Sequence, residues 1–358
     1  MSAPLELPCG LRIHQRVGFA PLTNTQSHAD GTLSHDEFEW LLRRAQGGFE
    51  WLSTCATYVS DDGKAWQGQL GIATDAHIAG LQPLTARLRE FGAKPIMQLH
   101  HGGPMANQAP RGPVAATERP GVRAASIEEL ELTVQTFANA ARRAERAGFS
   151  GVELHGANGY LFTNFLSPVE NQRTDAYGAG LAGRAKLIRD AMRAVREVVS
   201  PTFAVGVRLS PIDVYANRGL TSADTLQVAT WLCEDGADFI HLSLADAACA
   251  DPLSSDGKTV ASIFRNGLPA NVPVLAAGGI WTQSDLRRAH DVGVDIGVIG
   301  TAAIIHPDWP RASLLPNWEP QRLPVTVEVL RAAGAGQGMI DYLLKRPGFV
   351  VGGTPRRM

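Results

Sequence analysis

Short apolar runs alternate with amphipathic stretches along nearly the whole chain of 358 residues. Eight of these runs are rich in β-branched and aromatic residues and predict β-strands. They cover residues 17–23, 49–59, 94–99, 150–156, 203–209, 238–244, 272–277 and 295–300. Strands that alternate with helices form parallel sheets, and eight such units close a barrel. The pattern predicts an α/β protein with a single (β/α)8 barrel at about residues 17–316.

The stretches between the runs have helical periodicity and helix-end signals. Ser34 with Glu37, and Ser126 with Glu129, predict capping boxes at the starts of two helices. Gly148 predicts the end of the second of these helices. Further helices are predicted at residues 181–199, 221–236 and 282–293.

Two segments interrupt this regular alternation. Residues 100–125 contain too much glycine and proline for a regular element, and predict a long loop after the third strand. Beyond residue 316 the pattern predicts one helix within residues 325–348 and then a Gly-Pro-rich end. Residues 317–358 are therefore a C-terminal extension to the barrel.

Composition narrows the class of protein. Hydrophobic residues make up 44% of the chain and charged residues 19%, which suits a globular protein with a large core. The net charge of -2 and the pI near 6.6 give no basis for binding nucleic acid. The chain also has no signal-peptide pattern and no long uninterrupted apolar run, so we expect no membrane association and a cytoplasmic location.

The cysteines and the paired histidines do not predict a metal site. Cys9, Cys55, Cys233 and Cys249 are far apart and form no CxxC pair, so we expect reduced thiols. His100 and His101 are adjacent, and neighbours on a strand point to opposite faces, which makes them poor joint ligands.

Polar residues gather where the predicted strands end. They are Thr23, Gln98, His155, Asn158, Arg208 and His241. The C-terminal ends of the strands form the active face of such a barrel. A single polar residue there is more often a satisfied structural group, but six at one rim favour a functional site.

The last two units suggest a phosphate site. Gly278, Gly279 and Gly300 follow the seventh and eighth strands, where glycines let backbone N–H groups approach an anion. These glycines could also serve only to permit tight turns. Arg208 can hold a phosphate or the edge of a ring system, or pair with Asp213, and the Gln98 amide suits the pyrimidine edge of a flavin.

Several motifs together resemble the Old Yellow Enzyme family of FMN-dependent ene-reductases. They are "FAPLTN", "QLGIATDAHIAGLQPLTARLREFGAKPIMQLHHGG", "GVELHGANGYLFTNFLSPVENQRTDAYG" and "VRLSP". The resemblance runs from about Leu5 to Pro307, in order and with similar spacing. Within it, "LELPCGLRIHQRV" resembles the N-terminal β-hairpin, about residues 5–17, that closes the barrel bottom in that family.

The resemblance implies a bound FMN that is reduced by NADPH or NADH and then reduces an activated alkene, typically an α,β-unsaturated carbonyl compound. His155 and Asn158 match the pair that holds the substrate carbonyl oxygen, and Tyr160 matches the proton donor to the α carbon. The implied cofactor-binding residues are Ala20, Pro21, Leu22, Thr23, Ala56, Gln98, Arg208, Gly278, Gly279, Gly300 and Thr301.

The sequence departs from the family pattern at two positions of the site. Thr301 stands where the family usually has a phosphate-binding arginine. Lys258, Arg265, Arg287 and Arg288 are the cations that could replace it, and the sequence does not select among them. Thr25, the other departure, stands where some relatives have a substrate-contacting tyrosine, so it is a candidate substrate-binding residue.

Two other functions remain open from the residues alone. One is a flavin-binding redox sensor with no alkene turnover, and the other is a flavin-free barrel lyase or isomerase that acts on a phosphorylated substrate.

In some relatives a C-terminal arginine enters a neighbour's site. By analogy Arg356 or Arg357 could do so in a homo-oligomer.

Overall fold

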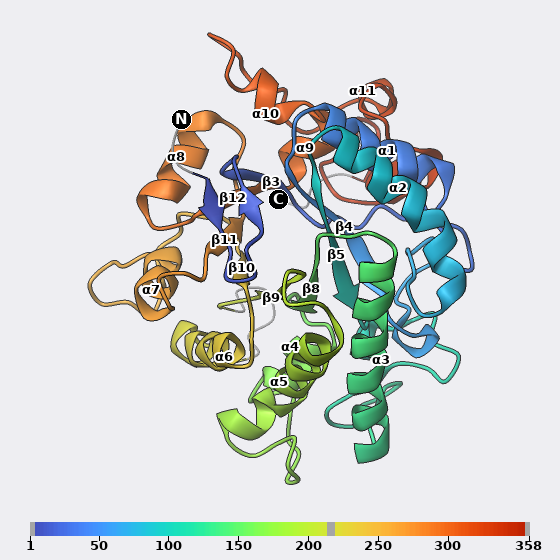
Figure 1. The fold of residues 1–358 in the computed structure, drawn as a ribbon, viewed down its shortest axis with the longest axis vertical. Helices are drawn as coiled ribbons and strands as arrows, with labels where there is room; N and C mark the ends of the chain where they lie inside the picture. Colours follow the sequence, from blue (N-terminus) through green and yellow to red (C-terminus); the bar gives the residue numbers. More distant parts are fainter. Residues whose placement is uncertain (1–3, 213–218, 355–358) are drawn as a thin grey trace.

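A closed barrel of eight parallel strands forms the centre of the molecule (Figure 1). The computed structural model describes residues 4–212 and 219–354. The strands follow the order β10-β11-β12-β3-β4-β5-β8-β9 around the barrel. They are β3 (Val17–Phe19), β4 (Trp51–Tyr58), β5 (Lys94–His100), β8 (Gly151–Gly156), β9 (Ala204–Leu209), β10 (Phe239–Ser243), β11 (Val274–Ala277) and β12 (Ile296–Ile299). Each lies within its predicted run, except that β5 extends one residue further, so the predicted fold is confirmed.

Helices surround the barrel on the outside (Figure 1). The longer ones are α1 (His35–Gln46), α2 (Ile78–Glu90), α3 (Ile127–Arg146), α5 (Leu181–Val198), α6 (Ser222–Glu234), α7 (Val260–Gly267) and α8 (Gln283–Asp291). Short helices are α4 (Leu161–Leu166), α9 (Thr301–Ile305) and α10 (Trp309–Ala312). Within the described ranges, no helix combines the length and apolarity needed to cross a membrane.

The two predicted capping boxes have different outcomes. At α3 the Ser126 side chain accepts from the Glu129 amide and the Glu129 carboxylate accepts from the Ser126 amide, so this box is confirmed. At α1 the Ser34 hydroxyl accepts from the Glu37 amide, but the Glu37 carboxylate does not return to the cap. It is fully buried and accepts hydrogen bonds from Asn24 and Ser27 instead. The second box is therefore only half formed, because a buried carboxylate needs interior donors.

A hairpin closes the N-terminal end of the barrel. Its strands are β1 (Leu5–Glu6) and β2 (Arg12–Ile13), which pair antiparallel. Leu7 and Ile13 are buried in one cluster with Trp51, which lies at the start of β4. These apolar side chains fill the barrel interior at this end.

The segments outside the barrel pattern contain more structure than the sequence predicts. The loop after β5 includes a 3-10 turn (Gly103–Met105) and the two-residue strands β6 (Val114–Ala115) and β7 (Arg123–Ala124). The single helix expected within residues 325–348 is wrong, because two helices occur: α11 (Val327–Ala332) and α12 (Gln337–Leu344). Gly334, at φ +89°, breaks the helix in a left-handed conformation that glycine adopts easily.

Candidate active site

A cavity of about 180 Å3 lies where β3, β11 and β12 end. It is lined by Ala20, Leu22, Arg208, Leu244, Ala277, Gly278, Gly279, Ile280, Trp281, Gly300 and Thr301. Seven of these belong to the predicted cofactor set, so the structure brings most of that set together at one place. The other predicted members, Pro21, Thr23, Ala56 and Gln98, are not among its lining residues.

The turn after β11 has a backbone that requires glycine. Gly278 has φ +151° and Gly279 has φ +62°, both in regions that side chains rarely adopt. A Cβ atom at Gly278 would lie 2.4 Å from the Leu244 carbonyl oxygen. The backbone is therefore exposed to the cavity with no side chain in the way, which fits a bound phosphate group.

The cations proposed to replace the missing arginine at Thr301 are mostly engaged elsewhere. Lys258 pairs with Asp256, and Arg265 pairs with Asp295 and donates to backbone carbonyl groups. Arg287 is exposed. Among the four predicted cations, Arg288 has the clearest connection to the cavity.

Arg288 reaches the cavity edge through an acidic neighbour. Its guanidinium pairs with Asp285 at 3.0 Å and lies 3.9 Å from Asp246, whose backbone adjoins Gly279. A further cation, which the sequence did not select, is Arg322 of the C-terminal extension. Its guanidinium carbon lies 4.6 Å from the ring centre of Trp281, a cavity residue.

Arg208 connects the cavity to the barrel interior. Its Nη2 donates to the Ser243 hydroxyl at 3.0 Å, whereas its Nε is buried and has no partner among the described residues. The alternative partner Asp213 lies outside the described residues. A buried arginine nitrogen without a partner fits a site that holds a ligand with an electron-rich edge, such as a flavin.

A buried polar chain runs beneath the site. Gln98 donates to Glu153 at 2.7 Å, and His241 Nδ1 lies 2.7 Å from the other Glu153 oxygen. Burial would raise the pKa of Glu153, but His241, Arg208 and Gln98 together lower it, so the carboxylate is charged. His241 is fully buried and pairs in register with Arg208, which pairs in register with His155 on its other side.

His155 and Asn158 each have their acceptor atom engaged by the protein. His155 Nδ1 accepts from the Ala157 amide at 3.3 Å, so its hydrogen lies on Nε2. The Asn158 carbonyl oxygen accepts from the Ser243 hydroxyl at 3.1 Å. The same hydroxyl oxygen accepts from Arg208, so its single hydrogen remains available for Asn158. Both residues therefore present free N–H groups.

Tyr160 lies beside His155, with 5.0 Å between the ring centres. It directly precedes α4, and Asn158 in the same turn has φ +61°, which asparagine tolerates better than most residues. Burial raises the pKa of the Tyr160 hydroxyl to about 12. Burial also holds the pKa of His155 well below its usual range, with Arg208 and His241 adding to the effect. Both groups are thus uncharged near neutral pH.

The sequence reasoning missed two aromatic neighbours of Tyr160. The ring centre of His100 lies 4.4 Å from that of Tyr160 and 5.3 Å from that of His155. The ring centre of Trp66 lies 5.5 Å from that of His100 and 6.5 Å from that of Tyr160. His100 carries a signal in the sequence, because it is a polar residue at the end of a strand. In the described ranges no group of three or more His, Cys, Asp or Glu side chains could hold a metal ion.

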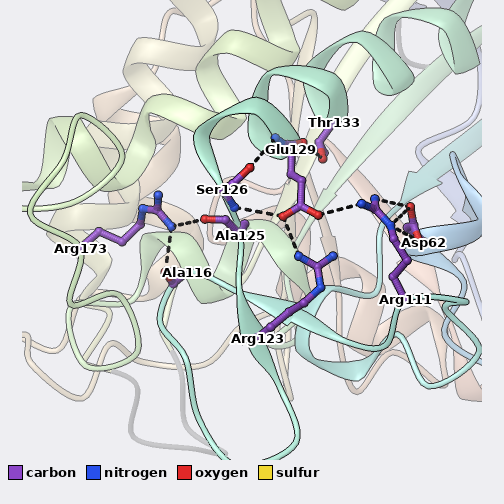
Figure 2. Close-up of polar contacts among 9 residues, drawn as sticks. All are labelled: Asp62, Arg111, Ala116, Arg123, Ala125, Ser126, Glu129, Thr133 and Arg173. Atoms are coloured by element: carbon purple, nitrogen blue, oxygen red, sulfur yellow. Dashed lines mark hydrogen bonds and ion pairs between the residues drawn. The ribbon is translucent and has the colours of Figure 1, made fainter.

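The long loop after β5 is tied to the start of α3 by charged side chains (Figure 2). Glu129 accepts from Arg111 at 3.0 Å and from Arg123 at 2.6 Å, and Arg111 also pairs with Asp62. Arg173 donates to the carbonyl groups of residues 116 and 125 from the other side. These contacts hold the middle and the C-terminal end of the loop that begins next to His100.

Thr25 contacts the C-terminal extension. Its hydroxyl donates to the Gly338 carbonyl oxygen at 2.8 Å, and Gln26 nearby accepts from the Gly336 amide. Tyr342 and Arg346 lie close enough to Tyr160 to affect its pKa. The extension thus covers part of the site, whereas its two terminal arginine candidates, Arg356 and Arg357, lie outside the described residues.

Comparison with known proteins agrees with this geometry. The model of the NADH:flavin oxidoreductase / NADH oxidase family matches residues 3–313. The chain is 33% identical to a probable NADH-dependent flavin oxidoreductase, YqiG, of Bacillus subtilis, over 86% of this chain and 85% of that protein. It is also 33% identical to an NADPH dehydrogenase of Bacillus pumilus, over 85% and 91% of the two chains.

A solved structure of an Old Yellow Enzyme homologue from Zymomonas mobilis superimposes with a TM-score of 0.79 and 25% identity, covering 95% of this chain and 98% of that one. The chain belongs to the Old Yellow Enzyme family. It is therefore an FMN-dependent oxidoreductase that takes electrons from NADH or NADPH. This membership sets aside the flavin-free alternative. Within the family, Gly278, Gly279, Gly300 and Arg208 are the residues whose geometry fits FMN.

Proposed function

We propose that this Old Yellow Enzyme is an ene-reductase. It would reduce the carbon-carbon double bond of an activated alkene, typically an α,β-unsaturated carbonyl compound, at the expense of NAD(P)H. One observation supports the proposal above all. The acceptor atoms of His155 and Asn158 are already engaged, so both side chains present N–H groups next to Tyr160.

The His155 and Asn158 donors suit the charge that forms during alkene reduction. FMN, when bound and reduced, supplies the hydride that adds to the β carbon. Negative charge then builds on the substrate carbonyl oxygen, and His155 and Asn158 stabilise it through their N–H groups. A fixed donor of this kind is typically worth about 3 kcal/mol of barrier. Because Ser243 and the Ala157 amide orient the two donors in advance, little reorganisation is needed.

Tyr160 completes the reduction by protonating the α carbon. With its pKa raised to about 12 by burial, the phenol keeps its proton at neutral pH and is a weak acid. The developing carbanion is a strong enough base to take a proton from it. Tyr160 is only partly buried, so solvent can return the proton afterwards.

A two-stage anaerobic experiment tests the proposal. The FMN-loaded protein is reduced with one equivalent of NADPH or NADH while the flavin absorbance near its visible maximum is followed. 2-Cyclohexenone is then added without oxygen. Reoxidation of the flavin with formation of cyclohexanone is the expected result, whereas a flavin that stays reduced would favour the redox-sensor alternative. The nicotinamide that reduces the flavin faster identifies the preferred donor.

Isotope labelling tests the assigned proton path in the same assay. In D2O the Tyr160 hydroxyl exchanges its proton for deuterium, whereas the hydride comes from the nicotinamide. The product should therefore contain deuterium at the α carbon. Hydrogen in place of deuterium at the α carbon would contradict the assigned proton path.

A further inference from the structure

Two buried N–H donors beside Tyr160 have no hydrogen-bond partner among the described residues. They are Nε2 of His100 and Nε1 of Trp66, neither of which makes a hydrogen bond to any residue in the ranges 4–212 and 219–354. Their rings lie 5.5 Å apart, and both lie close to the Tyr160 ring. A buried donor left unpaired costs about 1–3 kcal/mol, so two at one place suggest that a ligand completes them.

Gln69 fixes which nitrogen of His100 carries the hydrogen. The Gln69 carbonyl oxygen accepts from the Ala65 amide at 2.8 Å, which sets the orientation of its amide group. Its Nε2 then lies 2.9 Å from the Ala56 carbonyl oxygen and 3.0 Å from His100 Nδ1, and donates to both. His100 Nδ1 is therefore an acceptor, and the unpaired Nε2 carries the hydrogen.

The surroundings of His100 keep it neutral. Burial holds its pKa well below the usual range, and the neighbouring His155 and His101 lower it further. Among the described residues, no lysine, arginine or carboxylate contributes to this shift. Trp66 is a neutral donor at any pH. The two groups thus offer hydrogen bonds without a compensating positive charge.

We infer that His100 and Trp66 form a second oxygen-binding subsite that selects alkenes with a second, uncharged carbonyl group. The inference rests on the proposed function, in which His155 and Asn158 hold the first carbonyl oxygen. Two neutral N–H donors satisfy a ketone, imide or ester oxygen well. A carboxylate would lose its hydration there, and neither of the two donors carries a positive charge to compensate, which is costly for a buried charge. The substrate class is therefore the enediones, unsaturated imides and unsaturated diesters.

Two substrates that differ by one carbonyl group test the subsite. 2-Cyclopentenone has one carbonyl oxygen, and 4-cyclopentene-1,3-dione has two on the same ring. The holoenzyme and the variants His100→Phe and Trp66→Phe are compared by kcat/KM for each substrate. We expect each variant to lose about tenfold on the dione, which corresponds to one hydrogen bond, and less than about twofold on the enone.

Further variants separate binding from a structural role. His100→Gln retains an N–H donor and should recover most of the activity on the dione. Trp231→Phe removes a tryptophan that stacks on Arg189 of α5, and it should leave the ratio between the two substrates unchanged. FMN content and melting temperature show whether each variant is folded, and either Phe variant alone is sufficient for the test.

The possible outcomes separate this inference from the proposed function. Equal losses on both substrates, or no loss on either, in a folded FMN-loaded variant would overturn the second subsite. A wild-type holoenzyme that reduces neither substrate would instead overturn the ene-reductase proposal. A selective loss on the dione that His100→Gln restores would support both.

Discussion

The proposed substrate end and the proposed phosphate end of the active face are built by different means. At the substrate end, side chains present N–H groups that other protein groups have oriented, as in the chain from Arg208 through Ser243 to Asn158. At the phosphate end, the backbone of Gly278 and Gly279 forms the wall, and Thr301 provides no positive charge. The substrate end is therefore sensitive to the chemistry of single side chains. The phosphate end is sensitive to backbone conformation and to added charge.

The two ends differ in construction because they stabilise different kinds of charge. The charge at the substrate end exists only during the reaction, so pre-oriented neutral donors stabilise it without holding the product too tightly. The phosphate charge is permanent, so even a modest change in local charge alters cofactor affinity directly. Substitutions at the two ends should therefore affect rate and cofactor binding separately.

Tyr160→Phe should produce the largest effect and confine it to the substrate end. Removing the acid should slow alkene reduction by about 10²–10⁴-fold, the usual range for a general acid. Reduction of the flavin by NAD(P)H should remain almost unchanged, because that step needs no proton at the α carbon. Stopped-flow measurement of the two half-reactions checks this, and equal losses in both would argue against the proton-donor role.

His155→Ala and Asn158→Ala should each slow alkene reduction by about 10²–10³-fold, the range for loss of one oxyanion donor. Both should also weaken the binding of phenolic ligands, which place an oxyanion where the enolate oxygen forms. Titration of the flavin spectrum with a phenol measures this. Unchanged titrations in both variants would remove the pair from the site.

Acid should destabilise the substrate end more than the phosphate end. Burial lowers the pKa of His100, His155 and His241, and lowers that of His101 to about 4. Below about pH 6.5 the unfolded chain binds protons at these positions that the folded chain does not bind. Stability is therefore fully present above pH 6.5 and is lost as pH falls, by up to about 1.4 kcal/mol per pH unit for each histidine.

Urea unfolding at pH 7, 6 and 5 measures that loss. Glu37 acts in the opposite sense, because burial raises its pKa and the folded chain then binds the extra proton. The variant His100→Gln isolates the histidine contribution, since it should flatten the pH dependence while leaving Glu37 in place. A wild-type stability that is constant between pH 7 and 5 would contradict the expectation.

Ser243→Ala should have a smaller effect than loss of either donor. Without the Ser243 hydroxyl, the Asn158 amide keeps its N–H groups but loses the contact that orients them. One hydrogen bond corresponds to about a tenfold slower alkene reduction. A loss as large as that of Asn158→Ala would mean that Ser243 acts on the substrate or cofactor directly.

The sequence predicted the barrel and the glycine turns that line the cavity better than it predicted how the donors are oriented. Strand periodicity fixed the eight strands, and glycines in the last two units lay where the cavity formed. The orienting groups are harder to find because they come from distant segments. Ser243 lies 85 positions from Asn158, and Gln69 lies 31 positions from His100. Nothing in the local pattern around either residue indicates its partner.

Thr301→Arg tests the phosphate end and should have the smallest effect of these substitutions. A guanidinium at the cavity edge would add a charge-assisted hydrogen bond to the FMN phosphate, and partial exposure should limit the gain to roughly 3–10-fold in affinity. Flavin fluorescence during titration of the apoprotein measures the dissociation constant at low and high salt. Thr301→Gln, which adds length without charge, should show no gain. Equal gains for both variants would mean that contact area, not the missing charge, limits FMN binding at this end.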